Sequence, residues 1–199
     1  MLYILCKLLF TIPFFLLFRP RIQGYRHLFF MGKGVVVSNH NDLSDPIYLA
    51  LVCPRIIHFM AKQELFQYPA LKLLLKGLFA FPVYRKHADM ASLKQAMTVL
   101  EKGKVFGIFP EGRRSVTGEL DAFEKGAAFL ALRSNAPIIP IYADHRAPGR
   151  MRIRMNIGAP MDPKVIADAY SGRAVDAVTD ALRDRMQLLK NELESWDRP

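Results

Sequence analysis

The stretch Val35-Val36-Val37-Ser38-Asn39-His40-Asn41-Asp42-Leu43-Ser44-Asp45-Pro46 decides the fold. It begins as a short β-branched run, which is typical of a buried strand. It then becomes polar and restarts at Asp45-Pro46 as a helix, because Asp is a good N-cap and Pro is preferred in the first helical turn. Open α/β sheets place their sites at the carboxyl ends of buried strands. The polar residues between the strand and the helix therefore form a candidate site.

Apolar strand-like runs alternate with helical patterns along the rest of the chain. The further strands are expected at residues 56–61, 81–84, 104–109 and 137–142. Residues 151–157 alternate between apolar and polar, which predicts a strand with one wet face near a sheet edge. Residues 165–196 are helical and charge-rich, with Gly172 dividing them. This alternation predicts an α/β fold with a mixed, largely parallel central sheet flanked by helices.

Charge and cysteine content restrict the classes of partner. The 199 residues carry a formal net charge of +10 and are 51% hydrophobic. Such a balance implies an anionic partner, which is nucleic acid, lipid headgroups or a phosphorylated substrate. Cys6 and Cys53 lie in apolar segments without a CxxC pair, so neither a disulfide framework nor a zinc site is expected. A lone histidine among scattered carboxylates offers no other metal cluster.

The first 18 residues are almost wholly apolar, and Arg19-Pro20-Arg21 follows them. About 20 apolar residues are needed to span a bilayer, and Pro13 would kink the segment. A signal peptide is less favoured because the segment lacks a basic leader and a small-residue cleavage site. We expect residues 1–20 to be a membrane anchor, spanning or re-entrant, with a buried core helix as the alternative. A second apolar segment, residues 65–81 with Lys72 and Lys76, fits an interfacial segment and an ordinary core helix equally well.

His40 and Asp45 are the first candidate site residues. Five helical steps separate side chains by about 140°, so on one continuous helix the two would face apart. They can meet only if a loop feeds the helix, as Asp45-Pro46 indicates. An imidazole held by a carboxylate has a fixed tautomer and makes a good general base. The alternative is that Asp45 only caps the helix and His40 is a surface loop residue.

Two basic turns follow other strands. The turn after residues 104–109 contains Glu111-Gly112-Arg113-Arg114, and Arg85-Lys86 follows residues 81–84. Paired arginines, with a glycine that lets the backbone approach closely, suit a phosphate cradle, although a solvated basic turn has the same composition. Because parallel strands end at one edge of a sheet, we expect both turns to converge with His40.

The motifs resemble those of the glycerolipid acyltransferase family, which includes the 1-acyl-sn-glycerol-3-phosphate acyltransferases. The NH-x4-D motif stands at Asn39 to Asp45, and the apolar strand ending in arginine stands at Phe81 to Arg85. The FPEG motif with its following Arg and Ser matches Phe109 to Ser115. An apolar strand with an internal proline matches Ala136 to Tyr142. The resemblance covers residues 22–160, and residues 21–199 are expected to form the catalytic domain. The chain departs from the family at Arg113, where the family often has Thr.

The resemblance implies the chemistry. His40, oriented by Asp45, removes the proton from an acceptor hydroxyl, expected to be the sn-2 hydroxyl of lysophosphatidic acid. The alkoxide attacks the thioester of acyl-CoA or acyl-carrier protein directly, so no covalent enzyme intermediate and no cofactor are expected. Backbone amides near the first motif are candidates for stabilising the oxyanion. The acceptor phosphate is expected to contact four residues of the two basic turns, which are Arg85, Gly112, Arg113 and Arg114. Glu111 is expected to orient the site.

The expected partners are the membrane bilayer, lysophosphatidic acid and the acyl donor, with phosphatidic acid as the product. No nucleic-acid module is recognisable, and the apolar N-terminus argues against that partner. The expected location is the cytoplasmic face of a membrane, the inner one if the protein is bacterial. Two alternatives stay open: the same chemistry on another lyso-lipid acceptor, and a catalytically silent membrane-binding protein.

Overall fold

The computed structural model describes residues 2–83, 90–144, 153–170 and 172–196. Among these residues a seven-stranded sheet runs in the order β1-β7-β6-β2-β5-β3-β4. The five strands from β6 to β4 are parallel to one another, and β7 runs antiparallel to β6. The strands are β1 (Arg21–Gln23), β2 (Gly34–Ser38), β3 (Ile57–Lys62), β4 (Phe81–Val83), β5 (Val105–Ile108), β6 (Ile138–Asp144) and β7 (Arg154–Ile157). The sheet is thus α/β, mixed and largely parallel, as the sequence predicts.

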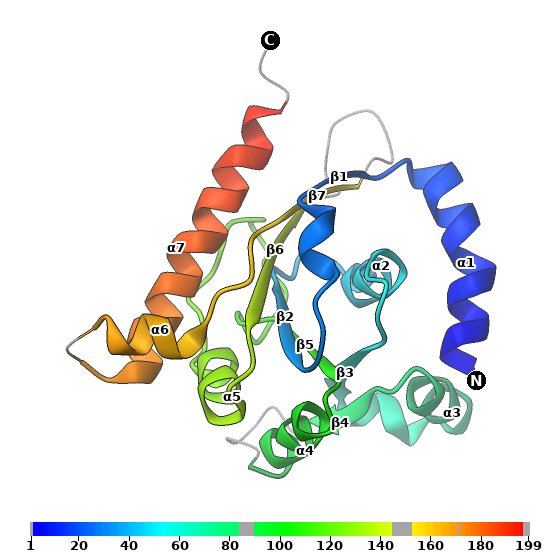
Figure 1. Ribbon diagram of the computed structural model, residues 1–199. Helices are drawn as coiled ribbons and strands as arrows, with labels where there is room; N and C mark the ends of the chain where they lie inside the picture. The colour runs from blue at the N-terminus through cyan, green and yellow to red at the C-terminus, as the bar shows by residue number, and fades with distance from the viewer. Residues whose placement is uncertain (1, 84–89, 145–152, 171, 197–199) are drawn as a thin grey trace.

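Helices cover both faces of the sheet, with α5 and α7 on one side and α1 and α2 on the other (Figure 1). The α-helices are α1 (Leu2–Phe18), α2 (Asp45–Val52), α3 (Pro69–Gly77), α4 (Met90–Glu101), α5 (Gly126–Ser134), α6 (Pro163–Asp168) and α7 (Ala174–Ser195). Two 3₁₀ helices, η1 (Tyr25–Leu28) and η2 (Gln63–Gln67), connect strands to their neighbours.

β2 is the centre of the core because both of its faces are buried. Val35 and Val37 belong to the cluster formed with α4, α5 and α7, whereas Val36 belongs to the cluster formed with α1 and α2. All three valines are fully buried. A strand buried on both faces reads as a continuous apolar run rather than an alternating one. The run Val35–Val37 therefore places β2 inside the sheet and carries the polar residues after it to the sheet's edge.

The strand expected near a sheet edge at residues 151–157 is found as β7, next to the edge strand β1. The expectation that one of its faces is wet is wrong, because its last three residues are buried. The alternating polar residues of β7 have polar partners inside the fold. Arg154 forms an ion pair with Asp144 of β6, and Asn156 donates to the Leu189 carbonyl oxygen of α7. The edge strand beside β7 is β1, a three-residue strand that the basic and aromatic sequence after residue 20 does not reveal.

α1 is a 17-residue helix that packs on α2 through Phe14, whose ring lies 5.6 Å from that of Tyr48. Most of its other large apolar side chains are exposed. Its amino end lies beside α3 (Figure 1), where Leu2 contacts Gly77. None of the helices in the described part of the chain combines the length and apolarity needed to cross a bilayer.

Candidate active site

The polar residues that follow β2 place His40 and Asp45 in direct contact. The His40 Nδ1 atom lies 2.9 Å from Asp45 Oδ2, and both residues are buried. The loop 39–44 turns the chain back, so two side chains that would diverge on one helix meet here. Because a carboxylate only accepts, Nδ1 carries the proton and the ring's second nitrogen, Nε2, carries the lone pair. That arrangement presents a proton acceptor at the carboxyl end of β2.

Asp45 does more than begin α2. It is the first helical residue and Ser44 is the cap residue, so the expectation that Asp45 is the N-cap is wrong by one position. Its Oδ2 atom accepts hydrogen bonds from the backbone nitrogens of Asn41 at 2.7 Å and Asp42 at 2.8 Å. These two amides of the first motif are thus directed at Asp45 rather than at a substrate oxyanion. The carboxylate holds both the imidazole and the loop that carries it.

The turn after β5 reaches the same place. β2 and β5 are adjacent and parallel, with Val37 paired to Ile108. The His40 carbonyl oxygen accepts a 2.7 Å hydrogen bond from the Ser115 backbone nitrogen. The Phe109 ring stacks on the imidazole, with centroids 4.2 Å apart and planes at 21°. The first and third sequence motifs therefore form one structural unit, and Phe109 supplies a contact that the spacing of polar residues does not reveal.

Glu111 is the acidic residue of this turn. It is buried, and its Oε1 atom accepts a hydrogen bond from the His40 backbone nitrogen at 3.3 Å. Burial raises the pKa of Glu111 to about 7, with the charges of Asp121 and Asp45 adding to the rise. Gly112 next to it has a φ of +65°, a left-handed conformation that a residue with a Cβ adopts at a cost. These two residues shape the turn around the backbone of His40.

The raised pKa makes the stability of the protein depend on pH. The folded state binds the Glu111 proton more tightly than the unfolded state, so this residue's contribution falls as pH rises from about 4.5 to about 7. The full shift corresponds to at most about 3 kcal/mol. We expect Glu111→Gln to remove this loss: its free energy of unfolding relative to the wild type should increase between pH 5 and pH 8 in urea titrations. Glu101→Gln, an exposed control, should show no such trend; a parallel pH profile for Glu111→Gln and the wild type would contradict the assignment.

The two arginines of the turn are placed differently. Arg113 Nη2 lies 3.2 Å from Asp121 Oδ2, and its side chain is 70% exposed. Such exposed ion pairs contribute about 0–1 kcal/mol, so the Asp121 carboxylate holds the Arg113 side chain only weakly. Arg114 is exposed as well. Arg85, expected at the end of β4, lies outside the described residues.

Asn39, which the motif contains but the chemistry does not require, joins β2 to β6. Its Nδ2 atom donates to the Ala143 carbonyl oxygen at 2.9 Å, and its Oδ1 atom accepts from the Ala143 nitrogen at 2.8 Å. The side chain thereby continues the strand pairing beyond Ser38, directly beside His40. From sequence alone, a buried asparagine that bridges two strands cannot be distinguished from an asparagine in a loop.

Asn39→Ala should therefore be strongly destabilising. It leaves a buried backbone donor and a buried acceptor of Ala143 without a partner, at about 1–3 kcal/mol each. We expect a decrease of roughly 2–5 kcal/mol in the free energy of unfolding, measured by urea denaturation. Asn191→Ala, on the exposed face of α7, is the control and should change it by less than about 0.5 kcal/mol. Equal effects of the two substitutions would show that the Ala143 bonds do not stabilise the strand end.

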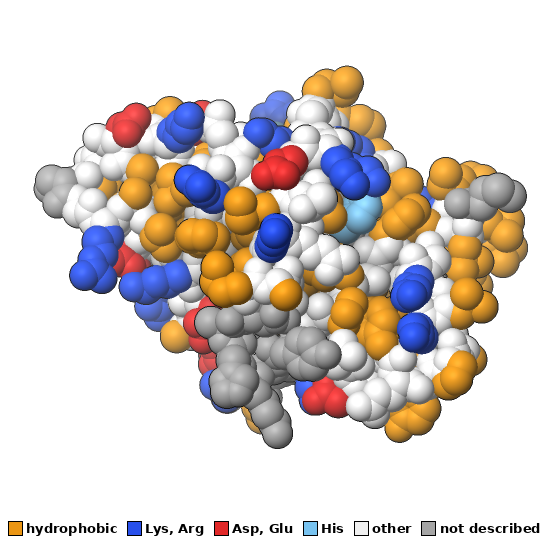
Figure 2. All heavy atoms as spheres, turned by 90° about the horizontal axis from the view of Figure 1, so that it is seen from below, with side chains coloured by type: hydrophobic (Ala, Val, Ile, Leu, Met, Phe, Trp, Pro, Cys, Tyr) orange, Lys and Arg blue, Asp and Glu red, His pale blue; other side chains and the backbone are white. Residues whose placement is uncertain are grey.

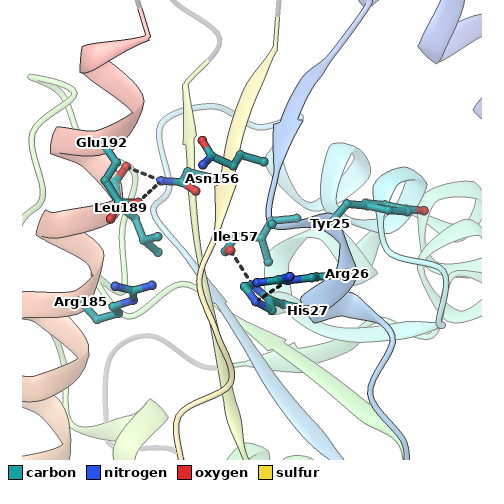
Figure 3. A pocket seen from close by; sticks show the side chains of 10 residues that line it. Tyr25, Arg26, His27, Asn156, Ile157, Arg185, Leu189 and Glu192 are labelled. Carbon is teal, nitrogen blue, oxygen red and sulfur yellow. Dashed lines mark hydrogen bonds between the residues drawn. The ribbon is translucent and has the colours of Figure 1, made fainter.

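Outside this site, a polar hollow of about 440 Å³ lies between η1, the end of β7 and α7 (Figure 3). Several of its polar groups bond to one another: Asn156 donates to Glu192 at 2.8 Å, and His27 Nδ1 lies 2.9 Å from the Ile157 carbonyl oxygen. The Glu192 carboxylate also repels anions. In the described part of the chain no group of three or more His, Cys, Asp or Glu side chains could hold a metal ion.

The fold and the strand-end His–Asp pair agree with the acyltransferase motifs of the sequence. The Acyltransferase family model matches residues 19–144, and the chain belongs to this family. It is 32% identical to the 1-acyl-sn-glycerol-3-phosphate acyltransferase of Bacillus subtilis over 166 residues, which cover 80% of this chain and 82% of that protein. The protein is an acyltransferase enzyme.

Other relatives differ in length or in sequence. The chloroplastic 1-acyl-sn-glycerol-3-phosphate acyltransferase BAT2 of Brassica napus is 31% identical over 140 residues, and this chain covers 40% of its length. The crystal structure of the 1-acyl-sn-glycerophosphate (LPA) acyltransferase PlsC from Thermotoga maritima superposes with a TM-score of 0.71 at 22% identity. That match covers 90% of this chain and 73% of the other, and it shows that the fold is shared.

Proposed function

We propose that the protein transfers a fatty acyl group from acyl-CoA or acyl-carrier protein to the sn-2 hydroxyl of 1-acyl-glycerol-3-phosphate, giving phosphatidic acid. The observation that carries this proposal is the contact between His40 Nδ1 and Asp45 Oδ2 at the carboxyl end of β2. The Bacillus subtilis relative is a 1-acyl-sn-glycerol-3-phosphate acyltransferase, which supports the choice of acceptor. A hydroxyl acceptor needs a base, and this pair supplies one.

The proposed reaction is a direct displacement in which His40 is the catalytic base. Its Nε2 atom takes the proton of the acceptor hydroxyl as that oxygen attacks the thioester carbonyl carbon. The C–S bond then breaks, and the proton passes from His40 to the leaving thiolate, so the base is regenerated. Asp45 is a positioning residue that holds the Nδ1–H tautomer and stabilises the imidazolium that forms. The Phe109 ring restricts the imidazole to this orientation.

The acceptor phosphate is proposed to bind Arg113 and Arg114, with Arg85 completing the set and Gly112 allowing close approach of the backbone. Glu111 is buried and accepts a hydrogen bond from the backbone nitrogen of His40, and so is proposed to orient the base. Its burial and raised pKa favour the protonated form beside an anionic substrate.

The product identifies the reaction most directly. Purified protein should be given a defined acyl-CoA and, separately, an acyl-acyl-carrier protein, each with 1-acyl-glycerol-3-phosphate in mixed micelles. Mass spectrometry with fragmentation identifies the product and the position of the new chain. Phosphatidic acid with the new chain at sn-2 supports the proposal. Faster acylation of another lyso-lipid would favour the same chemistry on a different acceptor. No transfer from any donor would favour a catalytically silent membrane-binding protein.

Arg114 should affect acceptor binding more than turnover. Loss of one charge-assisted hydrogen bond costs about 1.5–3 kcal/mol, so Arg114→Ala should raise the KM for 1-acyl-glycerol-3-phosphate roughly 10- to 100-fold. The KM for the acyl donor should stay within threefold. Arg133→Ala, an equal charge change on the exposed side of α5, is the control. An equal rise in both KM values for Arg114→Ala would place Arg114 outside the acceptor site.

α1 is proposed to lie against the bilayer. Ten of its large apolar side chains are exposed, and apolar side chains gather along the margin where α1 lies (Figure 2). They are Leu2, Ile4, Leu5, Leu8, Leu9, Phe10, Ile12, Phe15, Leu16 and Leu17. Exposed contiguous apolar surface of this kind marks a contact with membrane or protein. We propose that residues 1–20 attach the domain of residues 21–199 to the cytoplasmic face of a membrane, with Arg19 and Lys72 near anionic lipid.

A further inference from the structure

A second, largely apolar hollow lies at the other end of the sheet from His40. It has a volume of about 740 Å³, within the usual range for small-ligand sites. One wall is α1, and the others are the beginnings of β3 and β5. Val105, at the start of β5, lines it, whereas Phe109, after the end of β5, stacks on His40. Four residues of strand separate these two positions by about 13 Å, so this groove is distinct from the candidate active site.

The α1 wall of the groove is an exposed apolar row. Ile4, Leu8 and Ile12 are spaced four residues apart and line the groove together. Their exposed fractions are 53%, 71% and 66%. These side chains line the groove but are not covered by other parts of the protein, so they form an exposed apolar surface along α1. Phe79, after the end of α3, extends this apolar surface. A flexible hydrocarbon chain fits such a surface.

Three cationic side chains line the same groove: Lys7, Arg55 and Lys104. Lys7 donates to the Cys53 carbonyl oxygen, and Arg55 donates to the Gly103 carbonyl oxygen at 3.1 Å. The cations therefore gather where the connection after α2 meets the turn before β5.

Their charges are not neutralised locally. The lining contains no Asp or Glu, and among the described residues no carboxylate forms an ion pair with any of the three. The carbonyl oxygens that Lys7 and Arg55 contact are neutral. Burial lowers the pKa of Lys7, which shows the cost of holding its charge in this place. An anion that entered the groove would offset that cost for Lys7 and would pair with the charges of Arg55 and Lys104.

We propose that this groove binds one anionic phospholipid taken from the bilayer, with an acyl chain along Ile4, Leu8 and Ile12 and the headgroup phosphate at Lys7, Arg55 and Lys104. Charge complementarity and the apolar row together select this occupant. A zwitterionic lipid such as phosphatidylcholine would bring a quaternary ammonium group beside the three cations together with its phosphate, and a soluble anion would leave the apolar row exposed. The site does not depend on acyl transfer, because it shares no residue with the turn around His40.

Native mass spectrometry tests the proposal on the full chain extracted from nanodiscs of phosphatidylcholine with equal phosphatidylglycerol. The wild type should retain one phosphatidylglycerol per chain, at least tenfold above phosphatidylcholine. Lys7→Gln/Lys104→Gln should reduce that retention at least tenfold. Lys94→Gln/Lys164→Gln, the same charge change at exposed positions of α4 and α6 outside the groove, is the matched control and should retain the lipid within twofold.

Three results would overturn the proposal. These are equal retention of the two lipids by the wild type, equal loss in the two double variants, and preferential retention of oleate when it is added at equal concentration. The melting temperature of each variant is measured alongside, and Lys104→Gln alone, at an exposed position, provides a second variant if the double variant unfolds. Retention should be unchanged in His40→Ala, so the outcome is independent of the acyltransferase reaction.

Discussion

Replacing His40 by alanine should lower kcat for acyl transfer by roughly 10²- to 10⁴-fold, the range that a positioned general base contributes. The fold should survive, because the carbonyl and backbone nitrogen of residue 40 can keep their bonds to Ser115 and Glu111. The KM values for donor and acceptor should change little, since the imidazole acts on the reacting proton rather than on the phosphate. Steady-state kinetics with both substrates varied give these parameters.

The control for this variant is His27→Ala, a partly buried histidine of η1 outside the site. It should leave kcat within about threefold of the wild type. Melting temperatures of the two variants, measured together, show whether a loss of activity reflects unfolding. If His40→Ala kept its fold and lost less than tenfold in kcat, the assignment of His40 as the base would be wrong.

Replacing Asp45 by asparagine should lower kcat by roughly 10²-fold or more, as happens when the carboxylate that holds a catalytic histidine is neutralised. The amide oxygen can still accept from the backbone nitrogens of Asn41 and Asp42, so the loop can stay in place. The imidazole loses its anionic partner, so the imidazolium that forms during proton transfer is less stabilised. Asp42→Asn, the same charge change in the same loop, should remain within about threefold of the wild type.

A double-mutant cycle shows whether Asp45 acts through His40. If it does, Asp45→Asn should have almost no further effect on kcat in the His40→Ala background, because the group that it positions is absent. Full additivity of the two losses would contradict a shared role. The cycle therefore separates positioning of the base from a general structural effect of Asp45, which a single variant cannot do.

The fold could be predicted from sequence to the extent that local patterns decide it. The β-branched run at Val35 to Val37 and the Asp45-Pro46 signal locate β2 and α2 to within a residue. The short margin strand β1 could not be predicted, because three residues carry no periodic signal and its pairing with β7 joins segments more than 130 residues apart. The burial of β7 could not be predicted either, because its polar face is covered by contacts to β6 and α7 that no local pattern reveals.

The candidate site was predictable in composition but not in geometry. Sequence spacing indicates that His40 and Asp45 can meet, and the turn after β5 was expected at the same edge. The bonds of Glu111 and Ser115 to the backbone of His40 depend on the pairing of β2 with β5, which no local pattern reveals. The role of Asn39 as a bridge to Ala143 is likewise visible only in three dimensions.

The central claim is direct transfer from the thioester to the acceptor at this strand end, without an acyl-enzyme. Intact-protein mass spectrometry of the wild type with acyl-CoA, sampled before and after addition of 1-acyl-glycerol-3-phosphate, tests it in one experiment. We expect an unmodified protein mass throughout and phosphatidic acid only after the acceptor is added. A protein-bound acyl group that disappears as phosphatidic acid forms would contradict it.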